Sequence, residues 1–409
     1  MVDEGVLGQI HGQVKAELST CVNFWLRNGQ DTENGGVYTC LDETGRVFST
    51  DKSVWMQGRC AWTFSRLCNL YGRQPGWQAF AKSCLDFLEA YCINRKANGR
   101  MYFTVTADGQ PLRQRRYHFS ECFYTMANAE YYALTGGRDY LDRARSAWEM
   151  IWQLDQGLVP DPTGLAPKAD PATRRGRALA NPMIYLNLCS VLEGCDPDNA
   201  VIYRARAKTC AQTILTLHHR PELKATLEMV GENGEFWAQV AEGRVVNPGH
   251  DMECAWFLLE HALALGDEKT ADKAVEMFDF AYNNGWDDAY GGLLYYTDVL
   301  GHPPEAYEHD MKLWWPHNEL LIAALMIYRY TGREKYLRIF IKAWEYAMGA
   351  FREPVHGEWY GYLHRDGKPT LPAAKGSTFK GPFHLPRMLM KLDGMLGSER
   401  CALELDNRV

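Results

Sequence analysis

Residues 317–332 read HNELLIAALMIYRYTG, an apolar helical pattern that stops at a glycine. Glycine is favoured just past the end of a helix because it accepts the left-handed backbone conformation. The same pattern occurs six times in the chain, at 55–72 (WMQGRCAWTFSRLCNLYG), 120–137 (SECFYTMANAEYYALTGG), 181–194 (NPMIYLNLCSVLEG), 250–266 (HDMECAWFLLEHALALG), 317–332 and 384–397 (HLPRMLMKLDGMLG). The stops Gly72, Gly137, Gly194, Gly266, Gly332 and Gly397 are 57 to 72 residues apart, which indicates an internal repeat.

A second, less apolar helical pattern follows five of these glycines, and the N-terminal segment supplies a sixth. These patterns lie at 77–91, 140–153, 201–215, 271–284, 336–351 and 1–26. Short links between consecutive helices favour antiparallel neighbours. The sequence therefore predicts an all-α fold, a single (α/α)6 barrel domain over 1–409, with the Gly-terminated helices as its inner ring. An open solenoid is the alternative, and the absence of an obviously polar terminal unit favours closure.

Turn residues flanked by β-type residues separate most outer helices from the next inner helix. They lie at 35–48, 101–112, 236–246, 293–304 and 358–371. We expect short β-hairpins there, at one end of the barrel. The third unit instead contains a loop rich in Pro, Ala and Arg at 159–182.

Composition excludes several classes of protein. The net charge is -7 with both signs interspersed, so the chain has no nucleic-acid-binding character. No stretch has the roughly 18 uninterrupted apolar residues of a membrane helix, and the N-terminus lacks the apolar core of a signal peptide. The twelve cysteines are scattered without metal-type spacing. We expect a cytoplasmic protein with reduced, buried thiols and no membrane partner.

The starts of the inner helices converge on the barrel axis, so equivalent positions near those starts should meet. Thirteen residues before the six glycines lie Arg59, Tyr124, Asn181, Glu253, Glu319 and His384, and sixteen before two of them lie Glu121 and His250. One polar residue at a helix start is usually a cap or a solvated rim. A polar residue at nearly every equivalent position favours a functional cluster.

His250 and Glu253 share a helix face because they are three residues apart, and we expect Glu253 to orient the imidazole. His317 and Glu319 are two apart, so at most one faces the axis. The register selects Glu319, which makes His317 a supporting residue of the sugar site. A His/Glu cluster is also compatible with metal, but H-x-x-E is not a zinc-enzyme motif, and we predict no metal.

Seven runs of sequence resemble the N-acylglucosamine 2-epimerase family over roughly residues 5–395. They are WMQGR (55–59), FSECFYTMA (119–127), NPGHDMECAWF (247–257), GGLLYYTD (291–298), MKLWWPHNE (311–319), GEWYGYL (357–363) and FKGPFHLPR (379–387). The resemblance implies an (α/α)6 barrel that interconverts N-acetylglucosamine and N-acetylmannosamine. The family's essential residues fall on Arg59, His250, Glu319 and His384, which the register also selects. Within the same runs, Trp315 and Lys380 are further expected sugar contacts, beside Glu121, Tyr124, Asn181 and His317.

Inverting a carbon next to a carbonyl requires removal of its proton from one face and delivery to the other. We expect His250 and His384 to do this, because the unperturbed pKa of histidine, about 6.5, suits both roles. Arg59 would stabilise the oxyanion on O1 of the open-chain sugar. Glu253 and Glu319 would orient the histidines or hold hydroxyls. The chemistry requires no cofactor.

The resemblance also implies a homodimer and ATP as a non-consumed activator. The family loop before the third inner helix resembles PGTRPMKALAVPM, whereas this chain has PATRRGRALANPM at 171–183. Arg174 and Arg177 are the expected nucleotide contacts. Because the loop lacks a Gly-rich phosphate cradle, we expect weak nucleotide binding or none.

Three rival functions use the same residues differently. An aldose–ketose isomerase, or an epimerase of an unsubstituted sugar, would share the scaffold, and Asn181 is similar to those branches. They usually place a histidine four residues later, where this chain has Tyr185. A glycosidase would need Glu253 and Glu319 as its carboxylate pair. A binding protein of the renin-binding type would need no chemistry.

Overall fold

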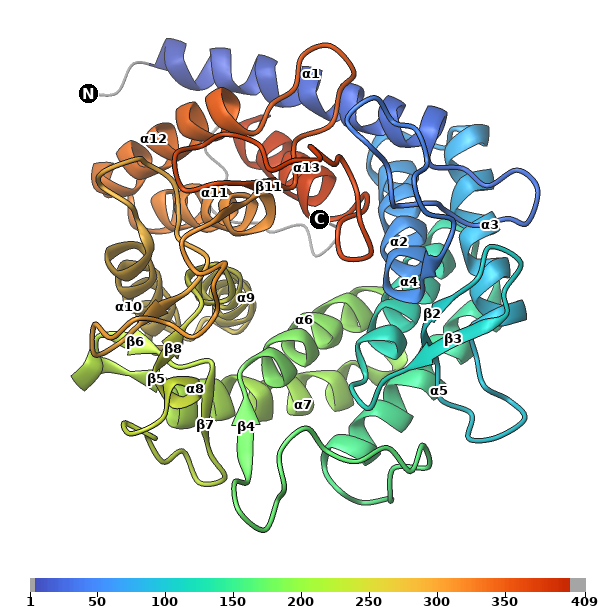
Figure 1. Ribbon diagram of the computed structural model, residues 1–409, viewed down its shortest axis with the longest axis horizontal. Helices are drawn as coiled ribbons and strands as arrows, with labels where there is room; N and C mark the ends of the chain where they lie inside the picture. The colour runs from blue at the N-terminus through green and yellow to red at the C-terminus, as the bar shows by residue number, and fades with distance from the viewer. Residues whose placement is uncertain (1–3, 398–409) are drawn as a thin grey trace.

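The computed structural model describes residues 4–397, in which the helices form two concentric rings (Figure 1). The inner ring holds α2 (Val54–Tyr71), α4 (Phe119–Thr135), α6 (Ala180–Cys195), α9 (Pro248–Leu265), α11 (Trp314–Thr331) and α13 (His384–Gly397). The outer ring holds α1 (Glu4–Asn28), α3 (Pro75–Tyr91), α5 (Arg138–Asp155), α7 (Ala200–Thr213), α10 (Glu268–Gly285) and α12 (Glu334–Ala350). Successive inner helices contact one another, and α13 contacts both α11 and α2. The ring is closed, which confirms the predicted (α/α)6 barrel.

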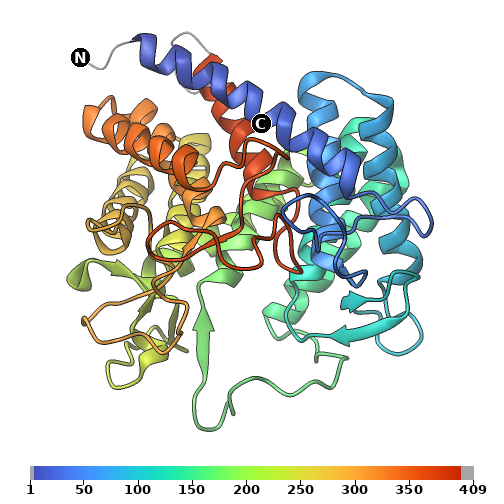
Figure 2. The ribbon, with the colours of Figure 1, turned by 45° about the horizontal axis from the view of Figure 1, so that its top comes forward.

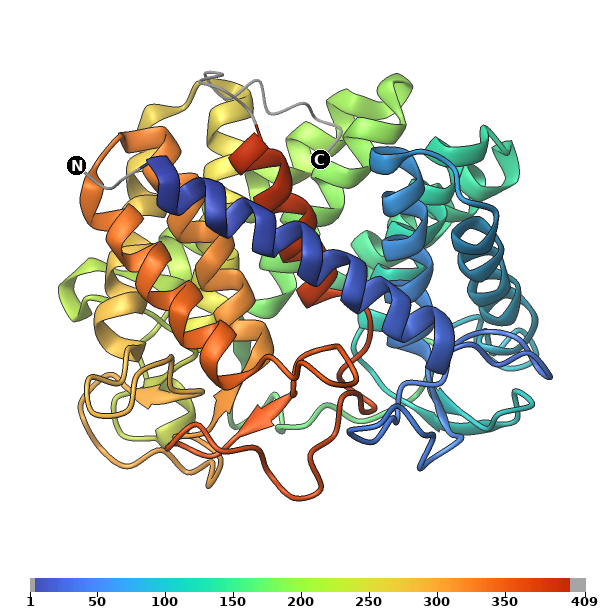
Figure 3. The same ribbon diagram turned by 90° about the horizontal axis from the view of Figure 1, so that it is seen from above.

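The two ends of the chain complete the ring together. Helix α1 packs against α13, so the first and last helices form the sixth pair (Figures 2 and 3). Buried hydrophobic residues from α1 through α13 belong to one continuous cluster. Within residues 4–397, no helix is long and apolar enough to cross a membrane.

Short strands lie at the end of the barrel where the inner helices begin (Figure 3). A strand immediately precedes four inner helices and pairs with a strand from elsewhere in the chain. These pairs are β1 (Lys52–Ser53) with β2 (Tyr102–Val105), β4 (Gly176–Ala178) with β7 (Met229–Gly231), β8 (Val245–Val246) with β9 (Thr297–Asp298), and β10 (Lys312–Leu313) with β11 (Tyr362–Leu363). The pairings link one helix pair to another, so they fix the inner-helix starts relative to each other.

Local hairpins are fewer than expected. Strand β3 (Pro111–Gln114) folds back on β2, and β5 (His219–Arg220) pairs with β6 (Ala225–Thr226). Within each of the segments 35–48 and 358–371 a single bridge stands in place of a local hairpin, and β11 in the second segment pairs with the distant β10. A hairpin at 236–246 was a wrong prediction, because the segment forms the short helix α8 (Ala241–Arg244) and then β8.

Two of the six predicted glycine stops are displaced. Helix α4 ends at Thr135 with Gly136, not Gly137, in the left-handed conformation at φ 74°. Helix α6 continues through Gly194 to Cys195. Counting back from Gly137 and Gly194 therefore selects residues that lie on a different helix face from those selected on the other inner helices.

Buried lysines anchor two inner-helix starts by a shared arrangement. Lys312 lies two residues before α11 and donates to Asp287 Oδ2 at 3.0 Å, whereas Lys52 lies two residues before α2 and donates to Asp31 Oδ2 at 2.6 Å. Both lysines are fully buried. Each aspartate begins the turn after an outer helix, so one ion pair connects an outer-helix end to an inner-helix start.

Replacing Lys312 with alanine should destabilise the barrel, because Asp287 would lose its buried cationic partner and keep the half-exposed Arg365. A buried charge left wholly unpaired costs about 3–5 kcal/mol, so we expect a loss below that value but above that of an exposed pair. The control is Lys335→Ala, which removes an exposed pair with Asp279 worth less than about 1 kcal/mol. Chemical denaturation of both variants measures the difference, and equal losses of unfolding free energy would contradict the anchoring role.

Candidate active site

A cavity of about 510 Å³ opens where the inner helices begin. This volume lies within the 300–1,000 Å³ range of small-molecule sites. All six inner helices contribute to its wall. Five predicted site residues line it: Arg59, His250, Glu253, Trp315 and His384. Glu319 lies fully buried beside them, in contact with His384.

His250, on the first turn of α9, is held by a carboxylate that the sequence did not indicate. Its Nδ1 lies 2.7 Å from Glu228 Oε1 and 3.0 Å from Oε2. An ionised carboxylate only accepts hydrogen bonds, so Nδ1 carries the proton and Nε2 is left for the cavity. Burial disfavours the charged imidazole, but the charge and hydrogen bond of Glu228, with the charges of Glu253 and Glu319, together raise the pKa of His250 above its ordinary value.

Backbone pairing places Glu228 between two inner-helix starts. The amide of Leu179, just before α6, donates to the carbonyl of Glu228 at 2.9 Å, and the amide of Glu228 donates to the carbonyl of Val245 at 3.2 Å. Because Val245 opens β8, directly before α9, these bonds fix Glu228 against the helix that carries His250.

His384, the first residue of α13, is oriented by Glu319. Its Nδ1 donates to Glu319 Oε1 at 2.8 Å, which again leaves Nε2 for the cavity. Trp256 Nε1 donates to the other carboxylate oxygen at 2.8 Å, and Arg387 donates to Oε1 at 2.7 Å. Glu319 therefore has little freedom to move away from His384.

The two histidines have opposite protonation preferences. Burial, and then the positive charges of Arg59 and Arg387, lower the pKa of His384 well below its ordinary value, whereas the pKa of His250 is raised. His384 therefore favours the neutral form of a base, and His250 favours the protonated form of an acid more than an ordinary histidine does. Trp315 contacts both rings, at centroid distances of 5.0 Å from His250 and 5.7 Å from His384.

Glu253 does not orient His250 as expected. Its carboxylate instead accepts a hydrogen bond from Arg387, whose same nitrogen also binds Glu319. Ligand atoms of Glu253, Glu319 and His384 lie within 4.8 Å of one another, a spacing compatible with a metal ion. The guanidinium of Arg387 already supplies positive charge to both carboxylates. Arg387 was not selected from the sequence, although it lies three residues after His384 on the same face.

Arg59 faces the cavity with its donors free. Its guanidinium carbon lies 4.2 Å from the ring of Phe123 and 4.8 Å from that of Phe383. Among residues 4–397 Arg59 makes no hydrogen bond, and its buried Nε is without a partner. Burial lowers the pKa of Arg59 to about 9, so the group remains charged at neutral pH. Aromatic rings hold the cation while leaving its N–H groups for an anionic ligand.

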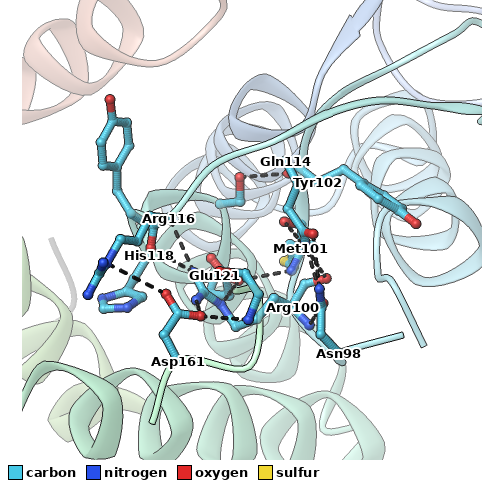
Figure 4. A network of polar contacts seen from close by, with 12 residues as sticks. Asn98, Arg100, Met101, Tyr102, Gln114, Arg116, His118, Glu121 and Asp161 are labelled. Carbon is cyan, nitrogen blue, oxygen red and sulfur yellow. Dashed lines mark hydrogen bonds and ion pairs between the residues drawn. The ribbon is translucent and has the colours of Figure 1, made fainter. Parts of the chain in front are cut away.

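Glu121, Tyr124 and Asn181 do not line the cavity, which corrects their expected role as sugar contacts. Glu121 accepts hydrogen bonds from Arg100 Nε at 2.6 Å and from the Met101 amide at 2.9 Å, and so anchors strand β2 (Figure 4). Tyr124 donates to Glu89 at 2.6 Å, and Asn181 donates to Asp155 at 3.3 Å. Tyr124 and Asn181 were counted from glycines that do not mark the ends of α4 and α6. They therefore lie on the helix faces that point to the outer ring.

His317 and Lys380 do not line the cavity, and their polar atoms are taken by structural partners. His317 accepts from the Leu293 amide at 2.8 Å and donates to the Leu313 carbonyl at 2.6 Å, and burial lowers its pKa to about 3. Lys380 donates to Glu358 and to the Lys375 carbonyl, both at 2.7 Å. Both residues shape the loops around the site without offering a free polar group to a sugar.

Arg174 and Arg177 lie beside acidic residues of the neighbouring loops. Arg174 Nη1 is 3.5 Å from Glu242, and Arg177 Nε donates to the Glu232 carbonyl at 2.8 Å. The segment that leads into β4 extends away from the ring (Figure 2). Arg174 lines a separate cavity of about 750 Å³ whose other charged residues are Glu228, Glu242, Glu305 and Glu308.

Comparisons with known proteins identify the family and the fold. The model of the N-acylglucosamine 2-epimerase (GlcNAc 2-epimerase) family matches residues 36–380. The chain is similar to the N-acylglucosamine 2-epimerases of Bos taurus, 40% identical over 94% of this chain and 91% of that protein, and of Homo sapiens, 39% identical over 94% and 90%. The structure of cellobiose 2-epimerase from Bacillus thermoamylovorans has the same fold, with a TM-score of 0.82 at 19% identity over 95% of this chain and 99% of that one.

Replacing Glu228 with glutamine should lower the pKa of His250 by about one unit or more, because an opposite charge within 4–6 Å stabilises the imidazolium. Titration of the histidine NMR signals measures the shift. The matched control is Glu276→Gln, which alters the His219–Glu276 pair, 3.0 Å apart and outside the cavity. An unchanged His250 titration in Glu228→Gln would contradict the assignment of Glu228.

Proposed function

The chain belongs to the N-acylglucosamine 2-epimerase family, and we propose that it interconverts N-acetylglucosamine and N-acetylmannosamine. The observation that carries this proposal is the pair of histidines with opposite protonation preferences, both contacting Trp315. Inversion at C2 needs an unprotonated base and a protonated acid at the same moment.

His384 accepts the C2 proton from one face of the open-chain sugar, and His250 delivers a proton to the other face. In the reverse direction the roles exchange, because the pair holds one proton in either case. The carboxylates of Glu319 and Glu228 fix the Nδ1 proton of each ring, so each Nε2 acts on the substrate. The two histidines titrate as a pair, whose macroscopic pKa values belong to both rings.

Loss of the C2 proton places negative charge on O1 of the sugar. Arg59 has free N–H donors in the cavity and supplies the positive charge for this oxygen. Glu253 lines the same cavity beside Arg387 and holds sugar hydroxyls. The apolar side chains Ala180, Met183 and Ile184 of α6 form the wall suited to an acyl methyl group.

The rival activities fit these contacts less well. Glu253 and Glu319 both bind the same nitrogen of Arg387, so neither is free as the acid or nucleophile of a glycosidase. An aldose–ketose isomerase needs only one proton-transferring histidine, which leaves the second His–Glu pair without a role. A pure binding protein needs neither of the two His–Glu pairs.

ATP activation through the loop at 160–181 is not supported by its surroundings. A polyphosphate needs a net positive site, whereas Arg174 faces four glutamates of the adjoining cavity and Arg177 is bound to a backbone carbonyl. The residues do not fit the nucleotide. We propose that ATP binds this loop weakly and is not required for the chemistry.

Two smaller proposals concern the protein's setting. The family resemblance supports a homodimer, which sedimentation analysis would establish. The cysteines among residues 4–397 are free of disulfides, and this supports a reducing location such as the cytoplasm.

His250→Ala and His384→Ala should each lower the epimerisation rate by about 10²–10⁴-fold, the usual contribution of a general acid or base. Proton NMR with N-acetylmannosamine in D₂O follows turnover and C2 exchange together. A single-histidine variant can still exchange the C2 proton of one epimer with solvent, because the half-reaction on one face survives.

The control for both variants is His364→Ala, which removes an exposed histidine outside the cavity. Near-native turnover in either cavity variant would refute the two-base mechanism. Formation of a ketose by the native protein would instead favour the isomerase.

Millimolar ATP should leave the melting temperature almost unchanged. A micromolar site would add about 4 kcal/mol of stability at a thousandfold excess of ligand, by RT ln(1 + [L]/Kd). Differential scanning calorimetry detects this easily. A clear rise in melting temperature that disappears in the Arg174→Ala, Arg177→Ala double variant would restore ATP as a ligand of the loop.

A further inference from the structure

The opposite mouth of the ring contains a second, larger cavity of about 1200 Å³. It is lined by the later turns of α2, α4, α6, α9 and α13, whereas the active-site cavity is lined by their first turns. Four residues face both cavities: Met126, Asn187, Phe383 and Arg387. The two spaces therefore lie back to back along the ring axis. We call the second one the far cavity.

Six of the seven charged residues that line the far cavity pair with one another, and the seventh, Arg387, is held by Glu253 and Glu319. Arg66 lies 3.4 Å from Glu130, Lys391 contacts Glu260, and Arg204 contacts Glu193. A polyanion would find no net positive field among these pairs. They do present donors and acceptors side by side, which matches hydroxyl groups that both donate and accept hydrogen bonds.

Uncharged polar and aromatic groups complete the lining. Asn69, Ser190 and His261 add hydrogen-bonding groups, and burial lowers the pKa of His261, which keeps it neutral. Trp62 also lines the far cavity and supplies a flat aromatic side chain. An aromatic side chain among paired charges and uncharged polar groups suits a neutral polyhydroxylated ligand.

The far cavity touches the groups that orient a catalytic histidine. Trp256 and Arg387 both line it, and both donate to Glu319, which holds His384. A ligand in the far cavity thus contacts the back of the Trp256–Glu319–His384 chain. If the ligand binds one arrangement of Trp256, Glu319 and His384 more tightly than another, its binding shifts the position of His384 in the active site.

We propose that the far cavity is a second binding site for a neutral sugar of mono- to disaccharide size, and that its occupancy changes the rate of proton transfer at His384 through Trp256 and Arg387. The site is distinct from the cavity in which epimerisation is proposed. Its ligand needs no free aldehyde, because neither His250 nor His384 lines it.

The probe is methyl N-acetyl-β-D-glucosaminide, whose locked ring cannot open and therefore cannot be epimerised. Ser190→Trp, on an exposed part of the far-cavity wall, places a large side chain in the space. Lys208→Trp, on the exposed face of α7 and outside the lining, is the matched control. Titration calorimetry measures binding of the probe, and initial rates with N-acetylmannosamine measure kcat and KM.

We expect the probe to change kcat of the native protein by at least about twofold, because it acts away from the substrate. Ser190→Trp should lose that effect and one binding event while keeping its basal kcat/KM, and Lys208→Trp should behave as the native protein. Ala264→Trp, on the neighbouring helix α9, provides a second blocking variant if Ser190→Trp fails to fold. A probe that raises only KM, a probe that does not bind, or a kcat effect that survives both blocking variants would overturn the proposal. The calorimetric result stands even if the epimerase assignment fails.

Discussion

The buried contact of Arg387 with Glu253 and Glu319 is the interaction on which the centre of the ring depends. It joins α9, α11 and α13 at the axis, where unpaired charges would be costly. Two cations, Arg59 and Arg387, balance these two carboxylates. Glu228 is then the remaining carboxylate in contact with a cavity histidine, and it lies at His250. This balance favours a proton on His250 over one on His384, which is the arrangement that two-base epimerisation needs.

The sequence register located the site only as accurately as it located the helix ends. Arg59, Glu253, Glu319 and His384 were selected correctly as neighbours because their helices end at the glycines used for counting. The first residues past α4 and α6 are instead Gly136 and Asp196. Thirteen residues before Gly136 is Phe123, and thirteen before Asp196, the first residue past α6, is Met183. Both line the cavity, so the period was right and the end points were wrong.

Other parts of the site could not be read from a helical period. Glu228 lies in a loop, and its position depends on pairing between β4 and β7, which are more than fifty residues apart. Lys312 and Asp287 likewise meet only through tertiary structure. Glu121 was counted from the displaced stop Gly137, and Arg100 and the Met101 amide hold its Oε1 away from the cavity. Long-range hydrogen bonds decide the positions and directions of these side chains, and local sequence patterns do not reveal such bonds.

The orientation of the inner helices gives the two mouths of the ring different chemistry. Six helix starts surround the active-site cavity, and their free amides and dipoles favour negative charge there. This field assists Arg59 in stabilising the oxyanion, and it disfavours the protonated form of His384 at the start of α13. The far cavity adjoins the helix ends, where carbonyl oxygens favour donors. An anionic intermediate therefore belongs at one mouth, and a neutral, hydroxyl-bearing ligand at the other.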